Sequence, residues 1–405
     1  MGQIVGEETR VSSGRLENCI FFRHFIKYWQ AREGRRTIFF AIFRSGMVKK
    51  PILILFALLG LQPAFAQIGG KSVYSFLDLA IPARTAALGG NTIAIKDDDI
   101  STTFQNPALL SAATDNQLAF SFIKYLGDIK YGYVCYGKTI KNFGHFSAGM
   151  QQVGYGTFSQ RDEYGVETGL FHANDYSFNL SYAYDKDSSL TYGATLKTIY
   201  SKYAQYTSVG SAVDLGATYH KPKNQVTISA VVRNLGMQWK TYTGDKREKL
   251  PFNAQIGASF KVPKAPFRLM AVYDHLNLWD LTYTDPNNPP ATEDPFTHEP
   301  IKQHPFKKYM DKLGRHFIVA NEIIITKNLN LRIGFNYKRR KELILPDKQG
   351  IAGFSFGLGF RVSKFHFSYA YSQYSPAFGA HNFSITTNLS SFMRANKEAS
   401  PATPN

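Results

Sequence analysis

The stretch Phe354-Ser-Phe-Gly-Leu-Gly-Phe-Arg-Val362, followed after two residues by Phe365-His-Phe-Ser-Tyr-Ala-Tyr371, decides the fold class. In both runs a large apolar side chain occupies every second position, and small, polar or basic residues lie between. A period of two places the two sets on opposite faces of a β-strand. The runs therefore predict two strands, and the two-residue connector Ser363–Lys364 predicts a tight turn between them.

The same alternation recurs along most of the chain. It is clearest in Tyr176–Tyr184, Val209–Tyr219, Phe252–Phe260 and Leu329–Tyr337. Segments that begin near residues 117, 129, 143, 174, 189, 209, 225, 252, 267, 313, 329, 350, 365 and 379 give about fourteen strands, an even number as single-chain bacterial barrels have. We expect the apolar face to contact lipid and the small and polar face to line a lumen.

The connectors between these runs alternate between tight and long. The tight set is Asp185–Ser188, Lys221–Asn224, Pro263–Pro266, Lys327–Asn328 and Ser363–Lys364, and the long set is Tyr155–Asn174, Leu235–Pro251, Asp280–Leu313 and Arg339–Gln349. Outer-membrane barrels combine short periplasmic turns with longer outside loops. The sequence predicts an all-β fold, a transmembrane up-and-down antiparallel β-barrel over residues 117–392, with its long loops on the cell surface.

Composition agrees with a barrel. Aromatic residues make up 15% of the chain, with 24 Tyr and 32 Phe, as two interfacial aromatic girdles require. The mean hydropathy is only −0.25, because a membrane strand turns every second residue away from lipid. The formal charge of +17 comes from scattered Lys and Arg without a basic helix or recognition module, so we expect no nucleic-acid partner. Basic side chains at a rim suit anionic lipid headgroups or lipopolysaccharide.

The N-terminal region predicts export. Met47–Ala66 has a basic start at Lys49 and Lys50, an apolar run too short to span a bilayer, and the cleavage pattern Ala-Phe-Ala before Gln67. We interpret residues 47–66 as a signal peptide, although a short buried helix is the alternative. Residues 1–46 then become an upstream extension, with translation starting at Met47. Residues 393–405 form a polar tail.

Residues 67–116 differ from the strands and predict a plug-like segment in or beside the lumen. Phe76–Leu88 suggests short helical turns that end at Pro82 and at Gly89 and Gly90. Other residues that stand out are Arg84, Asp97, Asp98, Asp99, Asn106 and Pro107.

We expect these side chains to have structural roles. No nucleophile or base flanks Arg84, so it is expected to pair with Asp97, Asp98 or Asp99 rather than to act in catalysis. Asn106 and Pro107 predict the start of a turn or short helix. The aspartate spacing does not match an EF-hand loop, and we expect no metal and no cofactor.

The long connectors hold the candidate partner-binding residues, because exposed aromatics often anchor interfaces. They are Trp239, Tyr242, Phe296, Phe306 and Tyr309. His298, Glu299 and His304 lack the spacing of a helical zinc site, so solvated loop side chains are expected. Cys135 is expected to be a small buried or lipid-facing residue.

The series Gly69-Gly-Lys-Ser-Val-Tyr-Ser-Phe-Leu77, Ala83-Arg-Thr-Ala-Ala-Leu-Gly-Gly90, Asp97–Asp99 and Asn106-Pro-Ala-Leu-Leu110 resembles the PorQ family of outer-membrane proteins. The Asn-Pro-Ala element also resembles the wider group of PorV-like and FadL-type barrels. The resemblance extends from about Gln67 to Phe392. It implies a non-enzymatic component of the type IX secretion system of Bacteroidetes, which holds a PorZ-like surface protein in an attachment complex with PorU and PorV.

Three functions remain open at the level of sequence. The first is this outer-membrane scaffold, and the second is a FadL-like channel for hydrophobic small molecules. The third, a membrane-embedded hydrolase, needs a Ser, a His and an acid converging at one rim, and no motif organises them. We therefore expect a non-enzymatic protein.

Overall fold

The computed structural model describes residues 72–125, 127–223, 225–244, 246–282, 305–342, 350–375 and 378–392. The expected upstream extension, signal peptide and polar tail lie outside these residues, as do Phe296, His298, Glu299 and His304. No helix among the described residues is long and apolar enough to cross a membrane.

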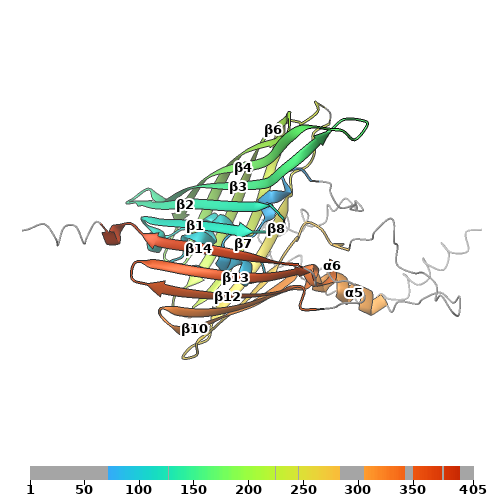
Figure 1. Cartoon of the computed structure of the whole chain (residues 1–405). Coiled ribbons are helices and arrows are strands. Elements are labelled where there is room, and N and C mark those ends of the chain that lie inside the picture. The colour runs from blue at the N-terminus through green and yellow to red at the C-terminus, as the bar shows by residue number, and fades with distance from the viewer. Residues whose placement is uncertain are drawn as a thin grey trace, which may run out of the picture. The chain divides into compact units, whose positions relative to one another are not determined.

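Fourteen strands form the body of the molecule (Figure 1). They are β1 Gln117–Lys124, β2 Lys130–Ile140, β3 Gly144–Arg161, β4 Glu167–Asp185, β5 Leu190–Tyr203, β6 Tyr206–Lys221, β7 Val226–Lys240, β8 Asn253–Lys261, β9 Phe267–Tyr273, β10 Phe317–Thr326, β11 Leu329–Asn336, β12 Phe354–Val362, β13 Phe365–Ser375 and β14 Phe378–Asn388.

The strands form one closed barrel in sequence order. Every strand pairs antiparallel with its neighbours in the chain, and β1 pairs with β14 through residues such as Phe122 and Phe383. Closure leaves no strand edge unpaired, which the interior of a lipid bilayer requires. The predicted antiparallel up-and-down barrel of about fourteen strands is confirmed.

The two faces of the strands carry the two predicted sets of side chains. Along β4, Phe178 and Leu180 point outward with 51% and 63% exposure, whereas Ser177 and Asn179 are buried inside. In β12, Phe356 is likewise exposed while its neighbour Ser355 is fully buried. An apolar outer surface around a closed strand cylinder is the arrangement of a transmembrane β-barrel.

One end of the barrel carries the six turns β2–β3, β4–β5, β6–β7, β8–β9, β10–β11 and β12–β13, and the other end carries the remaining connectors. The four connectors expected to be long all lie at that second end, hereafter the long-connector end. The same end also holds tight turns, since β5 and β6 are separated only by Ala204 and Gln205.

Two of the expected loops are shorter than predicted, because the strands extend into them. Most of Tyr155–Asn174 belongs to β3 and β4, and β7 continues to Lys240. A register shift interrupts the alternation in both places. In the pairing of β3 with β4 it lies between Gly154 and Thr157, and in the pairing of β6 with β7 it lies between Val213 and Leu215. A β-bulge breaks the period of two without ending the strand. The strands predicted from the alternation were therefore too short in both places.

Residues 72–116, hereafter the N-terminal segment, contain α4 (Ala83–Ala87) and short 3-10 helices at Ser75–Asp78, Ile100–Phe104, Pro107–Leu109 and Ala112–Thr114. Gly89 and Gly90 follow α4 with φ values of 83° and 96°, which glycine adopts without strain. The expected short helical turns and their stop are confirmed. Figure 1 shows this blue segment between the strands.

Two further helices lie at the long-connector end. They are α5 (Pro305–Gly314), between β9 and β10, and α6 (Tyr337–Glu342), between β11 and β12. The expected loops Asp280–Leu313 and Arg339–Gln349 thus contain helical turns in the parts that the structure describes.

Candidate functional site

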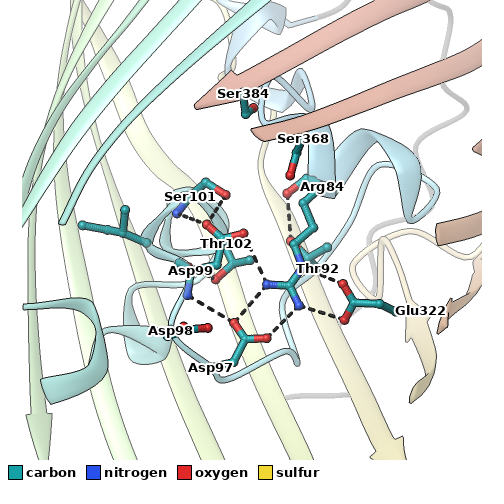
Figure 2. A network of polar contacts seen from close by, with 12 residues as sticks. Arg84, Thr92, Asp97, Asp98, Asp99, Ser101, Thr102, Glu322, Ser368 and Ser384 are labelled. Atoms are coloured by element: carbon teal, nitrogen blue, oxygen red, sulfur yellow. Dashed lines mark hydrogen bonds and ion pairs between the residues drawn. The ribbon is translucent and has the colours of Figure 1, made fainter. Parts of the chain in front are cut away.

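The guanidinium of Arg84 joins the N-terminal segment to the barrel wall (Figure 2). It lies 2.7 Å from Asp97 and 3.3 Å from Asp99 within the segment, and 2.8 Å from Glu322 on the inner face of β10. The expected ion pair thus forms with two of the three aspartates. Asp98 instead pairs with Arg361 at 3.1 Å, on the exposed side.

Two barrel arginines complete this ion network. Arg268 of β9 lies 2.8 Å from both Asp97 and Glu322, and Arg332 of β11 lies 2.8 Å from Glu322. Three guanidinium groups therefore face the three carboxylates of Asp97, Asp99 and Glu322. Buried charges are tolerated when they are paired in this way, and removing one partner leaves an uncompensated charge.

The network shifts the ionisation of its own members in the N-terminal segment. Burial alone would raise the pKa of Asp97, but Arg84 and Arg268 overcome it and hold that pKa at about 2. Burial likewise opposes the charge on Arg84, yet the carboxylates of Asp97 and Glu322 raise its pKa above the usual value. Both groups stay charged over the physiological pH range, so the network is permanent.

Inward-facing glycines bring the barrel wall against the N-terminal segment. A Cβ atom at Gly193 would lie 2.5 Å from the backbone of Pro107 and Ala108, and one at Gly334 would lie 2.2 Å from Gly89 N. Real Cβ atoms do not approach this closely, so only glycine fits there. Similar contacts with the segment occur at Gly137, Gly210, Gly216, Gly257 and Gly357, on β2, β6, β8 and β12. These strands are distributed around the circumference of the barrel, so the segment that contacts all of them occupies the lumen.

Asn106 begins the 3-10 helix Pro107–Leu109, as expected from the Asn-Pro pair. Its Oδ1 accepts from Ala108 N at 2.9 Å, and its Nδ2 donates to Ile93 O and to Thr218 Oγ1 at 2.7 and 3.0 Å. Thr218 lies on β6, so a helix cap also ties the segment to the wall. Both N–H donors of this buried amide and its oxygen therefore have a hydrogen-bond partner.

The long-connector end of the lumen is apolar and aromatic. Buried residues Val73, Tyr74, Phe76, Leu77, Ile81, Ile100, Phe104, Ile123, Tyr131, Tyr133, Val153, Ile199 and Leu250 form one hydrophobic cluster, against which Tyr125, Tyr155, Tyr242, Tyr374 and Phe378 pack. The ring of Tyr125 lies 4.7 Å from that of Phe378 and 5.7 Å from that of Tyr374. We name Tyr125, Tyr155, Tyr242, Tyr374 and Phe378 the aromatic mouth. It links the segment to strands from both halves of the barrel.

The partner-binding candidates separate in the structure. Trp239 lies in β7 at 59% exposure, and its Nε1 donates to Ser211 Oγ at 2.7 Å. Tyr242 packs instead at the aromatic mouth and bonds to Ser201. Trp239 is exposed on the outer face of β7, whereas Tyr242, beyond the end of β7, packs against the buried cluster, so the two do not share a surface.

Phe306 and Tyr309 lie together on α5. With Met310 and Leu313 they have the spacing of one helical face, and Phe306, Tyr309 and Met310 are 69%, 52% and 46% exposed. The ring of Tyr309 contacts Trp279 at a centroid distance of 5.4 Å. The described residues therefore present an exposed apolar helix face at the long-connector end.

Sequence reasoning missed Glu322, Arg268 and Arg332 as members of the ion network. The available signal was a single charge at an inward position of an apolar strand, as in Phe317-Ile-Val-Ala-Asn-Glu322, where a buried charge requires a partner. It did not identify the partner, because strands β9 to β11 are far from Arg84 in sequence.

A polar pocket of about 280 Å³ opens beside the network. It is lined by Lys96, His220, Pro222, Gln225, Thr227, Ser259, Lys261 and Arg268. Among the described residues, no group of three or more His, Cys, Asp or Glu side chains is arranged to hold a metal ion.

Comparisons with known proteins find similarity only in solved structures. No family model and no curated protein matches the chain. The Pseudomonas putida toluene transporter TodX covers 77% of this chain and 99% of its own, at 14% identity and a TM-score of 0.46. A Pseudomonas aeruginosa FadL homologue covers 76% and 98%, at 11% identity and a TM-score of 0.41. A KdgM porin gives a TM-score of 0.29 at 5% identity.

Proposed function

We propose that this chain is a non-enzymatic outer-membrane β-barrel that anchors a partner protein at the cell surface. The exposed apolar face of α5, formed by Phe306, Tyr309 and Met310, carries the proposal. Aromatic side chains displayed at a rim are frequent interface anchors. The long-connector end is the outside end in this proposal, as in barrels with short periplasmic turns.

The filled lumen supports a scaffold. The N-terminal segment contacts strands around the barrel and is held to the wall by the ion pairs of Arg84 with Glu322 and of Asp97 with Arg268. Such a barrel is a rigid platform, and a rigid platform lowers the entropic cost of binding. In its finer form, drawn from the Gly69–Leu77, Arg84 and Asn106–Leu110 motifs, the partner is a PorZ-like protein of a type IX secretion attachment complex with PorU and PorV.

The proposal is tested by changing the apolar face of α5. Phe306→Ser combined with Tyr309→Ser should release the surface partner into the medium, since each anchor of this kind contributes about 2 kcal/mol or more to binding. The matched control is Lys307→Ser with Lys308→Ser, on the same helix between the anchors. Partner retention on whole cells is measured by quantitative mass spectrometry at equal barrel levels. Full retention in the Phe306 and Tyr309 variant would refute the scaffold.

A channel for hydrophobic small molecules is the second candidate, and the aromatic mouth favours it. An apolar ligand could enter between Tyr125, Tyr374 and Phe378, where the lumen is lined by the hydrophobic cluster. Ligand pockets are typically apolar with few polar groups. Passage would then require the N-terminal segment to move.

Uptake of labelled toluene and of a long-chain fatty acid by intact cells distinguishes the two candidates. If the protein is a channel, Tyr125→Ala with Tyr374→Ala should change uptake while the surface partner stays bound. If it is a scaffold, uptake should equal that of cells without the protein.

A further inference from the structure

Lysine recurs in every short turn at the end of the barrel opposite the long connectors. Among the described residues, the six turns carry Lys141, Lys186, Lys223, Lys264, Lys327 and Lys364. The first five are exposed, and the ammonium group of Lys364 lies 4.5 Å from the centre of the Phe392 ring. We name these six residues the lysine ring.

The lysine ring is not neutralised by carboxylates of the protein. The nearby acids have other partners: Asp115 pairs with Lys138 at 3.6 Å, Asp185 with His145 at 2.9 Å and Lys96 at 3.5 Å, and Asp98 with Arg361 at 3.1 Å. The carboxylate of Asp187, in the β4–β5 turn, accepts from the backbone of Ser189 and Leu190. No ion pair within the described part of the chain uses a lysine-ring residue.

The opposite rim has a different pattern of charge. Its β1–β2 and β3–β4 connectors carry Asp128, Asp162 and Glu163 but no lysine, and its β5–β6 turn has no charged residue. Basic residues at this rim are instead concentrated in the later connectors, with Lys249 before β8, Lys307 and Lys308 on α5, and Lys338–Lys341 on α6. The regular placement of lysine is therefore a property of the short-turn rim and not of turns in general.

Outward-facing aromatics lie next to the lysine ring at the strand ends. They are Phe143, Tyr184, Tyr192, Tyr219, Phe260, Phe267 and Phe365, all between 39% and 69% exposed. Aromatic girdles mark the level where the hydrocarbon region meets the headgroups. The residues of the lysine ring lie in the turns beyond these strand ends. Their ammonium groups therefore stand at the level of the lipid phosphates, which a lysine side chain is long enough to reach.

We propose that the lysine ring binds the phosphate groups of anionic phospholipids in the leaflet around the short turns. The six turns join successive strand pairs, so the charge is distributed around the circumference. A single acidic protein would contact one sector, whereas a headgroup layer meets every turn. In the proposed orientation this is the periplasmic leaflet.

A local fluorescence experiment tests the proposal on the full-length chain. Phe143→Trp places a reporter at the short-turn rim, in a background in which Trp29, Trp239 and Trp279 are changed to Phe. Quenching by brominated phosphatidylglycerol relative to brominated phosphatidylcholine, in mixed vesicles, gives the relative association constant at that rim. Lys141→Gln with Lys186→Gln should lower it by up to about fivefold for each lysine removed, the factor for one basic side chain near an anionic surface.

The matched control is Lys124→Gln with Lys130→Gln, which removes two lysines from the opposite end of the β1–β2 hairpin. It should leave the ratio at the reporter unchanged, and high salt should lower the wild-type ratio by screening. An unchanged ratio in the Lys141 and Lys186 variant, an equal fall in the control, or salt insensitivity would overturn the proposal.

Two further arms keep the result interpretable. Sodium phosphate and sodium chloride should act equally at the same ionic strength, and a specific effect of phosphate would assign the ring to a free anion instead. If the Phe143→Trp barrel fails to fold, as judged by heat-modified gel mobility, Phe365→Trp with Lys327→Gln and Lys364→Gln repeats the test at another sector of the short-turn rim.

Discussion

At the scale of single residues, Arg84 has the most demanding position, because one guanidinium serves carboxylates of both the segment and the wall. Arg84→Gln leaves Glu322 and Asp97 with fewer partners and should destabilise docking of the segment by about 3–5 kcal/mol, as for other broken buried pairs. Limited proteolysis of the N-terminal segment in folded barrels measures the effect.

The control for Arg84 is Arg361→Gln. Its pair with Asp98 is exposed, at 47% and 61%, so the cost should be within about 1 kcal/mol. Equal protease sensitivity of the two variants would show that the buried network does not hold the segment.

The pKa of Asp97 gives the network a predictable response to acid. Because its folded pKa is about 2, below the ordinary value of 3.8, its contribution is fully present above about pH 4 and is lost as the pH falls toward 2. Segment protection against an acid-active protease, measured from pH 5 to 2, should therefore fall over this range. Asp97→Asn should flatten the profile, and an unaltered profile would contradict this assignment.

At the scale of elements, the inward glycines set how closely strands approach the N-terminal segment. Gly193→Ala should displace the Pro107–Leu109 helix and cost about 1–3 kcal/mol by overpacking. The matched control is Gly132→Ala on β2, where no atom lies within 4 Å of the added Cβ. Protection of the segment from proteolysis should fall only for Gly193→Ala.

The outer face of the strands should tolerate a new charge differently at different depths in the bilayer. Phe356→Arg, on the outer face within β12, should cost about 2–4 kcal/mol in folding into vesicles, and Phe365→Arg, at the start of β13 near the interface, about 0–1 kcal/mol. Equal costs would mean that depth in the bilayer is misassigned.

On the inner face, the small and polar residues suggest a water-filled lumen in which a new charge would be tolerated. The structure shows a packed interior instead. Ser355 is fully buried, and Arg339 Nη1 lies 3.4 Å from its hydroxyl. A new arginine at this position would therefore be resisted by packing and by like charge.

At the scale of the whole molecule, the strand pairing is independent of the N-terminal segment, because β1 to β14 close among themselves. Deleting residues 72–114 should leave a folded barrel with an open, hydrated lumen, since barrels of comparable strand number enclose water unless they are filled. Planar-bilayer recordings should then show a conductance that the full-length chain lacks. Equal conductance of the two proteins would contradict occupation of the lumen.

The sequence by itself determined the strands and their faces. The period of two places Phe178 and Phe356 outside and Ser177 and Ser355 inside, and this pattern is local, so it survives without tertiary information. The turn spacing likewise predicted which connectors share an end. Local pattern failed only where bulges near Gly154 and opposite Leu215 interrupt the alternation.

Only the tertiary structure decided what meets inside the barrel. The pairing of Arg84 with Glu322 spans 238 positions along the chain, and the contact of Gly193 with Pro107 depends on where the closed wall places β5. Neither contact has a periodicity, because each is made between one irregular segment and one point on the wall.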